Sequence, residues 1–381
     1  MTDAVYITNV AAFLPNDAID NEQMESVLGQ AGDRPSRARR IILRNNGIKT
    51  RYYAIDPATG EQNYSNARLG AEAVRKVADQ RINLDDIEAL AFATSMADQI
   101  MPGHAVMVHG ELQSAACEVV TTAGVCVCGI TALKYVYMGI KAGQFRQAVA
   151  GASEVASAVM RGHQFEAELE SRVAALEKNP EIAFEKDFLR WMLSDGAGAV
   201  LLQDQPAANS LSLRIDWIEI RSYAGEDEPC MYAGGDKENG RLRGWLQYSS
   251  DERAAISAMS VKQDVRLLNE KVIHYTVERT LSDILQKHSI TPADIDWFLP
   301  HYSSNYFRQK VYDGLCNIGF EIPFDKWFTN LTEKGNTGSA SIFIMLDELY
   351  HSGRLKPGEK LLCYIPESGR FSSAFMLLTV V

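Results

Sequence analysis

A cysteine, a histidine and an asparagine, far apart in the sequence, are the residues of this chain best suited to covalent chemistry. Cys126 lies within Gly124–Leu133, at the start of an apolar stretch that is typical of a helix. Backbone N–H groups converge at the start of a helix, and its positive end favours the thiolate, the nucleophilic form of cysteine. The start of the helix therefore favours the thiolate of Cys126, and we infer acyl transfer through a cysteine thioester.

Two polar residues in the second part of the chain are matching partners for this nucleophile. His301 follows the apolar run 298–300 and precedes a helical pattern, so its ring is expected at the edge of a sheet. Asn336 lies among small residues at 334–341, which permit close approach of the backbone around its amide. A neutral imidazole and an amide both donate hydrogen bonds to a thioester carbonyl and stabilise an enolate. Each residue alone would more often be an ordinary packed side chain, and their combination indicates acyl transfer.

The elements expected to position these residues occur twice along the chain. A helix over 66–80, a short loop and a buried strand recur about two hundred residues later, where the helix covers 271–288. The first strand leads to Thr94 and the second to His301. This order predicts an α/β protein with two duplicated halves, one holding the nucleophile and the other the polarising residues. A chance similarity between short segments is the alternative.

A boundary between the halves is predicted after residues 193–202. A Gly-rich turn enters a buried strand there, and polar, turn-prone residues follow. We assign residues 1–205 to the N-terminal half and 206–381 to the C-terminal half. A charged helical stretch near 160–188 is interpreted as an insertion, either a cap over the site or a solvated surface helix.

Composition limits the possible functions. With 381 residues, 46% of them hydrophobic, the chain can form two core-bearing halves. The net charge of −11 argues against broad binding of nucleic acids, which requires a basic surface. The six cysteines have no paired metal-ligand spacing, so no metal is expected. The N-terminus lacks the pattern of a secretory signal, and no apolar run reaches ~18 residues, so a cytoplasmic protein without a membrane span is predicted.

Several motifs resemble those of the β-ketoacyl-ACP synthase III family, a branch of the thiolase fold. They are Cys126, the segment 301–305, and 335–337 followed by small residues. Residues 46–51, Thr94-Ser95 with Met101-Pro102, and 195–199 are similar to further family motifs in the same order, so the resemblance covers most of the chain. It implies a layered αβαβα thiolase fold and a homodimer. It also implies phosphopantetheine thioesters as substrates, acyl-ACP or acyl-CoA, without another cofactor.

The resemblance also assigns the central residues. Cys126 would take the acyl group, and His301 and Asn336 would hold the second thioester. The oxyanion hole would consist of the backbone N–H groups of Cys126 and Gly369.

Two departures from the family pattern affect this assignment. Residues 367–370 replace the usual run of glycines around Gly369. Near the nucleophile, Cys128 is a second possible cysteine, and the register of Ala132 favours Cys126.

Other residues are expected to contact the substrate, the carrier protein or a neighbouring subunit. Basic residues between 34 and 51 would suit the acidic surface or the phosphopantetheine of an acyl carrier protein, although a solvated charged helix would look the same. Met101 would reach the pocket of a neighbouring subunit by the same resemblance. The residues assigned to this group are Arg37, Arg40, Asn305, Met101 and His163.

The departures resemble the DarB and StlD type ketosynthases of dialkylresorcinol and cyclohexanedione biosynthesis. The sequence thus predicts a Claisen-type condensation between the acyl group and a carrier-bound malonyl or β-ketoacyl thioester. One alternative is an acyltransferase of the same fold that forms an ester or an amide. Another is a non-catalytic synthase subunit, against which the presence of all three central residues argues.

Overall fold

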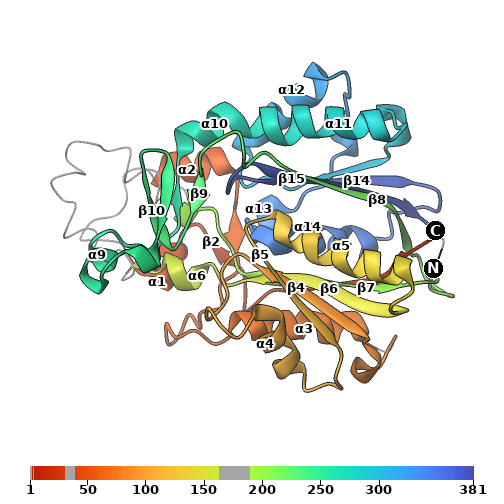
Figure 1. Ribbon diagram of the computed structural model, residues 1–381, viewed down its shortest axis with the longest axis horizontal. Coiled ribbons are helices and arrows are strands. Elements are labelled where there is room, and N and C mark those ends of the chain that lie inside the picture. Colours follow the sequence, from red (N-terminus) through yellow and green to blue (C-terminus); the bar gives the residue numbers. More distant parts are fainter. Residues whose placement is uncertain (1, 3, 31–38, 80, 163–188) are drawn as a thin grey trace.

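The computed structural model describes residues 2, 4–30, 39–79, 81–162 and 189–381, and it is organised around a nine-stranded mixed sheet (Figure 1). The strands of this sheet are β1 (Tyr6–Phe13), β4 (Ala89–Thr94), β5 (Glu118–Ala123), β6 (Gln147–Glu154), β7 (Gly196–Gln203), β8 (Leu213–Ser222), β13 (Trp297–Pro300), β14 (Lys360–Glu367) and β15 (Ser372–Val380). Their order across the sheet is β13-β14-β15-β8-β1-β7-β6-β4-β5.

The two ends of the sheet repeat one topology. In the N-terminal half, β4 is parallel to β5 and β6, while β7 is antiparallel to both β6 and β1. In the C-terminal half, β13 is parallel to β14, while β15 is antiparallel to both β14 and β8. A parallel bridge between Phe298 and Trp327 occupies the place that β5 has in the first half. The predicted duplication of an α/β half is therefore confirmed.

The halves join where β1 pairs with β8. Tyr6 lies opposite Arg214 and Ile7 opposite Leu213, so the seam is short. Residue 205 falls in the connection between β7 and β8, and the boundary at this residue stays a prediction. Met160 ends α6 (Ser157–Met160), and the rest of the expected insertion, from 163 to 188, lies outside the described residues.

Helices cover both faces of the strands and separate the two halves, which confirms the predicted layers (Figure 1). The outer layer of the first half holds α3 (Asn66–Ala78) and α4 (His104–Leu112). The outer layer of the second half holds α10 (Val265–Ile273), a π-helical turn (His274–Arg279), α11 (Thr280–Lys287) and α12 (Tyr306–Asn317).

The central layer consists of α5 (Val127–Ala142) and α14 (Ser341–His351). Helix α5 packs on β4 and β6 and also contacts β14 and β15, so it touches both halves. A helix between two sheets must be apolar on more than one side, which explains the almost continuous apolar sequence at 341–346.

Shorter elements surround this framework. They are β2 (Ile19–Asp20), β3 (Thr50–Arg51), β9 (Met231–Tyr232), β10 (Gly235–Glu238), β11 (Arg241–Gly244), β12 (Lys262–Gln263), α1 (Met24–Leu28), α2 (Arg39–Asn46), α9 (Ser250–Ala255) and α13 (Leu331–Lys334). The β10–β11 hairpin turns at Asn239 and Gly240, both with positive φ, as expected for a tight turn of this kind.

Within the described ranges, no helix combines the length and the apolar character needed to cross a membrane. The same ranges contain no group of three or more His, Cys, Asp or Glu residues arranged to hold a metal ion.

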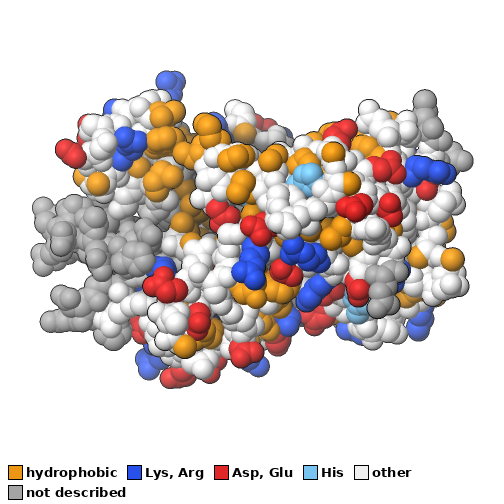
Figure 2. Space-filling view, turned by 90° about the horizontal axis from the view of Figure 1, so that it is seen from below, with side chains coloured by type: hydrophobic (Ala, Val, Ile, Leu, Met, Phe, Trp, Pro, Cys, Tyr) orange, Lys and Arg blue, Asp and Glu red, His pale blue; other side chains and the backbone are white. Residues whose placement is uncertain are grey.

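Acidic and basic side chains are intermixed on the face seen from below (Figure 2). Positive charge on this face does not form the continuous surface that a nucleic-acid backbone requires.

Candidate active site

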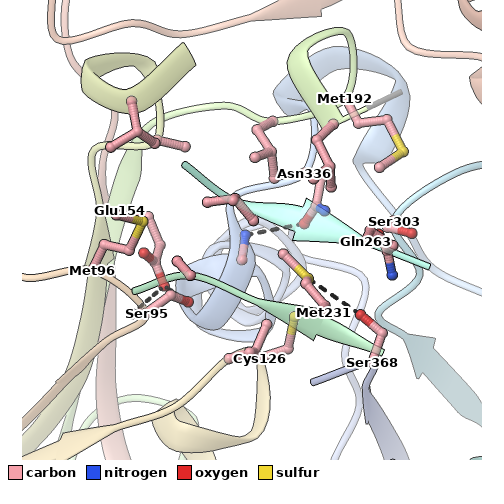
Figure 3. Close-up of a pocket in the computed structure, with 18 of the residues that line it drawn as sticks. Ser95, Met96, Cys126, Glu154, Met192, Met231, Gln263, Ser303, Asn336 and Ser368 are labelled. Carbon is pink, nitrogen blue, oxygen red and sulfur yellow. Dashed lines mark hydrogen bonds between the residues drawn. The ribbon is translucent and has the colours of Figure 1, made fainter. Parts of the chain in front are cut away.

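Cys126 lies at the turn that connects β5 to α5. The strand ends at Ala123, Gly124 follows with φ of +153°, and Cys126 is the residue that precedes the helix. The side of this turn that faces the interior borders a cavity of ≈ 280 Å³ (Figure 3). Cys126 also borders a smaller cavity of ≈ 50 Å³. The predicted nucleophile thus lies between two cavities.

Asn336 lines the larger cavity and is held through its backbone and its side chain. Its N–H donates to the carbonyl oxygen of Met192 at 3.0 Å, and its carbonyl accepts from the N–H of Ser194 at 2.8 Å. Its side-chain Oδ1 accepts from the N–H of Gly338 at 3.0 Å (Figure 3). Because the amide oxygen is engaged in this way, the Nδ2 group is the part that can bind a ligand carbonyl.

Close packing brings the Asn336 segment to the start of α5. A Cβ atom placed on Gly129 would lie 2.6 Å from the carbonyl oxygen of Ser339 and 3.0 Å from Cε2 of Phe343. Only glycine allows helix α5 to approach the turn at Gly338–Ala340 so closely. Gly129 therefore helps to set the separation between Cys126 and Asn336.

His301 directly follows β13 and lines the smaller cavity together with Cys126. Its N–H donates to the carbonyl oxygen of Tyr364 at 2.8 Å, and only 4% of its surface is exposed. Burial lowers the pKa of His301 to about 4. The ring is therefore neutral near pH 7, as expected from the sequence.

The two cavities share a wall at Cys126, Ser303 and Ser368. The structure thus brings Cys126, His301 and Asn336 to two adjoining cavities, of which His301 lines the smaller and Asn336 the larger. Cys128 is buried and is absent from the residues that border these two cavities, so the geometry favours Cys126 as the reacting thiol.

The effect of the helix start on Cys126 is outweighed by its other surroundings. Burial raises the pKa of Cys126, and the carboxylates of Glu367 and Glu154 raise it further. The positive end of α5 does not outweigh burial and two nearby negative charges. Cys126 therefore rests as a thiol.

The sequence interpretation assigned no function to these two carboxylates. Glu154 ends β6, lines the larger cavity and accepts hydrogen bonds from the hydroxyl groups of Ser95, at 2.7 Å, and Ser339. Glu367 ends β14 and accepts backbone hydrogen bonds from Val125 and Val127. In both cases the sequence feature that could have indicated a site residue is an acidic residue at the end of a strongly apolar strand.

Gly369 lies beside the turn that holds Cys126, because an added Cβ would come 3.1 Å from Cγ2 of Val125. Its carbonyl oxygen accepts hydrogen bonds from the N–H groups of Cys230, at 2.9 Å, and Met231, at 3.2 Å. The cavity wall next to Cys126 is formed by Ser368, whose hydroxyl donates to Sδ of Met231 at 3.4 Å (Figure 3). A role of the Gly369 N–H in the oxyanion hole stays a prediction.

The remaining predicted contact residues are not among those that line these two cavities, or they lie outside the described ranges. Arg40 is exposed on α2, and Asn305 is exposed where α12 begins. Met101 is 79% exposed. Arg37 and His163 lie outside the described residues.

Arg51 does not belong to the basic surface that was expected between residues 34 and 51. Its guanidinium is buried and donates to the carbonyl oxygen of Trp191, and burial lowers its pKa to about 10. The exposed positive charges near it are Arg40, Arg44 and Lys49.

Apolar side chains form most of the wall of the larger cavity, which suits an alkyl chain. They include Met96, Val125, Val155, Ala156, Val159, Leu189, Met192, Leu193, Met231, Ala233 and Val261.

Comparisons with known proteins agree with this geometry. The family model described as 3-oxoacyl-[acyl-carrier-protein (ACP)] synthase III C terminal matches residues 285–369, which include His301 and Asn336. A β-ketoacyl-[acyl-carrier-protein] synthase III from Bordetella petrii is 24% identical over 369 residues, covering 95% of this chain and 94% of the relative.

Solved structures share the fold over nearly the whole chain. A variant of OleA from Xanthomonas campestris, with bound lauric acid and lauroyl-CoA, is 18% identical with a TM-score of 0.75, and both chains are covered completely. A 3-oxoacyl-(acyl carrier protein) synthase III from Xanthomonas oryzae is 20% identical with a TM-score of 0.75 and 99% coverage of each chain. AbyA1, a tetronic acid condensing enzyme, is 18% identical with a TM-score of 0.73, covering 98% of this chain and 99% of its own. Three findings agree: the match to the family model, the similarity to the curated relative and the thiolase-like fold. Together they support the assignment of this chain to the 3-oxoacyl-ACP synthase III type of condensing enzymes, which belong to the acyltransferase class.

Proposed function

We propose that this protein loads an acyl group on Cys126 and joins it, by Claisen-type C–C bond formation, to a carrier-bound malonyl or β-ketoacyl thioester. The observation that carries the proposal is the position of Cys126 between two cavities, with Asn336 lining one and His301 lining the other. An acyl group on the thiol can then meet a second thioester within reach of hydrogen-bond donors.

The first half-reaction is acyl transfer. Sγ of Cys126 attacks the thioester carbonyl, the Sγ–C bond forms, the C–S bond to the carrier breaks, and the thiol proton passes to the departing carrier thiolate. The apolar wall of the larger cavity accommodates the alkyl chain. No cofactor is needed for this step, and the phosphopantetheine arm belongs to the substrate.

The second half-reaction needs an enolate. Loss of CO₂ from a malonyl group, or of an α-proton from a β-ketoacyl group, places negative charge on a thioester oxygen. The Nδ2 group of Asn336 and the neutral ring of His301 can donate to that oxygen, and a preorganised donor of this kind contributes roughly 3–4 kcal/mol to lowering the barrier. The enolate carbon then attacks the carbonyl carbon of the acyl group on Cys126. The C–C bond forms, the Sγ–C bond breaks, and the departing Sγ takes up a proton, which restores the thiol.

We propose a β-ketoacyl second substrate and a product of the dialkylresorcinol or cyclohexanedione kind. The support is the sequence resemblance to ketosynthases of those pathways. OleA, which shares the fold, has been crystallised with lauroyl-CoA, and AbyA1 is described as a condensing enzyme, so acyl thioester chemistry occurs on this scaffold.

A homodimer and an acyl carrier protein are the proposed partners. Strand β5 is at the edge of the sheet and none of its residues is fully buried, so it can pair with a second copy. Ile100 and Met101 are 68% and 79% exposed, which is unusual for large apolar side chains and fits a subunit contact. The exposed charges at Arg40, Arg44 and Lys49 would attract an acidic carrier.

Product identification tests the reaction. Acyl-ACP is incubated with malonyl-ACP or β-ketoacyl-ACP, and the products are identified by mass spectrometry. A C–C-linked product is expected, whereas an ester or amide would replace condensation with the alternative acyltransferase reaction. No turnover with any pair, in a protein that also fails to load Cys126, would indicate a non-catalytic subunit.

A pair of cysteine variants tests the nucleophile. C126A should lose acyl loading, because it removes the thiol that borders both cavities. C128A is the matched control and should load normally, because Cys128 is buried within the helix. Loading is read as the mass increase of the intact protein, and a fully loaded C126A protein would refute the assignment.

A further inference from the structure

Glu367 is a half-buried acidic residue that contacts the turn around the nucleophile from the opposite half of the protein. Its Oε2 atom accepts the N–H of Val125 at 3.3 Å and the N–H of Val127 at 3.2 Å. These two residues flank Cys126 in sequence, whereas Glu367 ends β14 in the C-terminal half. One carboxylate therefore holds both sides of the nucleophile's turn.

Two glycines lie next to this carboxylate. A Cβ atom added to Gly369 would lie 3.3 Å from Oε1 of Glu367, and one added to Gly124 would lie 3.8 Å from Oε2. The carboxylate thus lies between the hairpin that connects β14 to β15 and the turn that precedes α5.

This position gives Glu367 a second effect besides its hydrogen bonds. The first N–H groups of a helix carry partial positive charge, which would stabilise an anionic sulfur. Here a carboxylate occupies two N–H groups of the turn, so their partial positive charge is compensated by Glu367 and is not directed at the thiol.

We propose that Glu367 is a positioning residue for Cys126: its carboxylate fixes the nucleophile's turn through two backbone hydrogen bonds and places a negative charge that opposes formation of the thiolate. The proposal deepens the proposed function and rests on it, because it concerns the reactivity of the same thiol. The raised pKa of Cys126, to which Glu367 makes the largest contribution after burial, supports the geometry.

Other titratable groups also face Cys126. Glu154 approaches from β6, Cys128 from the first turn of α5, and His301 from the end of β13 across the smaller cavity. Burial keeps His301 neutral and Cys128 protonated near pH 7. Burial also raises the pKa of Glu154 and of Glu367, while the hydrogen bonds that the two carboxylates accept act in the opposite direction. The two glutamates are therefore the groups whose charge can be removed by substitution.

The substitution E367Q separates charge from hydrogen bonding. The glutamine side chain has the same length, and its amide oxygen can accept the same two N–H groups, but it carries no charge. Alkylation of Cys126 by iodoacetamide is followed against pH in a C128S background, and peptide mass spectrometry confirms the modified residue. Because only the thiolate reacts, the rate at a fixed pH below the midpoint reports the thiolate fraction.

We expect E367Q to move the alkylation profile to lower pH by about one unit, which is a roughly tenfold faster reaction at fixed pH. E367D retains the charge on a shorter side chain, and its profile should stay closer to that of the wild type. E154Q removes the charge of the other nearby glutamate and should shift the alkylation profile by less than E367Q does. Thermal unfolding of each variant shows whether the fold is intact.

An E367Q profile that coincides with the wild-type profile would overturn the proposal, as would slower alkylation or a larger shift in E154Q. Alkylation requires neither an acyl thioester nor condensation. A negative result here therefore leaves the proposed function standing, and a protein that fails to load acyl groups can still be tested for the role of Glu367.

Discussion

Replacing Gly129 with alanine tests whether the approach of α5 to the Asn336 segment sets the geometry of the site. The added Cβ would lie 2.6 Å from the carbonyl oxygen of Ser339, and ordinary van der Waals contact begins at 3.4 Å. The helix and the turn must therefore separate by about 0.8 Å. The obstacle is backbone in a short helical turn next to Asn336, so it cannot rotate away as a flexible side chain could.

Two magnitudes follow from this displacement. Overpacking of this kind typically costs about 1–3 kcal/mol of stability, offset in part by the ~0.5–1 kcal/mol that alanine gains over glycine in a helix. Misplacement of reacting groups by about 1 Å can cost roughly 100-fold in rate. We therefore expect G129A to fold with a lowered midpoint of thermal unfolding and to condense about 100-fold more slowly.

The same substitution at Gly110 is the matched control. Gly110 lies in α4, and a Cβ there would meet nothing within 4 Å. G110A should raise stability by ~0.5–1 kcal/mol and leave turnover unchanged.

The assay measures two rates, acyl loading on Cys126 by intact-protein mass and formation of the C–C-linked product. Loading requires the thiol, whereas condensation also requires Asn336, so G129A should lose more of the second rate than of the first. Wild-type condensation and stability in G129A, or equal losses in G129A and G110A, would refute the reasoning.

Two further predictions concern the polarising residues. N336A should retain loading of Cys126 but lose about 10²- to 10³-fold in condensation, because one donor to the enolate oxygen is removed; equal loss of both rates would contradict this role. The pKa of His301 is lowered to about 4 on folding, so the unfolded chain binds a proton first as pH falls from about 6.5. The free energy of unfolding should decrease between about pH 6.5 and pH 4, and H301Q should reduce this decrease in urea titrations. An unchanged slope in H301Q would show that the ring is not buried in neutral form.

The layered fold and the convergence of the three central residues could be predicted because their signals are local. A cysteine before an apolar helix, a histidine after a buried strand and an asparagine among small residues each mark the end of an element. Once the duplication is recognised, these ends must meet between the two halves.

The charge state of the nucleophile could not be predicted from the same local pattern. Helix α5 alone favours a thiolate, but burial raises the pKa of Cys126 most, and Glu367 from β14 and Glu154 from β6 raise it further. Arg51 illustrates the same limit, since its position in a basic run of sequence did not reveal that it faces inward and bonds Trp191. In both cases the residues that determine the environment of the side chain are more than a hundred residues away in the sequence or lie on another helix or strand.

The repeated topology gives each reacting position a structural counterpart. Cys126 precedes α5 in one half as the Asn336 segment precedes α14 in the other, and Ser95 follows β4 as His301 follows β13. Duplication of a single ancestral unit would bring two equivalent helix starts and two equivalent strand ends close together before any residue at these positions took part in catalysis. A complete site would then need only different side chains at positions that already met, so sequence divergence between the copies, rather than a new fold, would have created the active site.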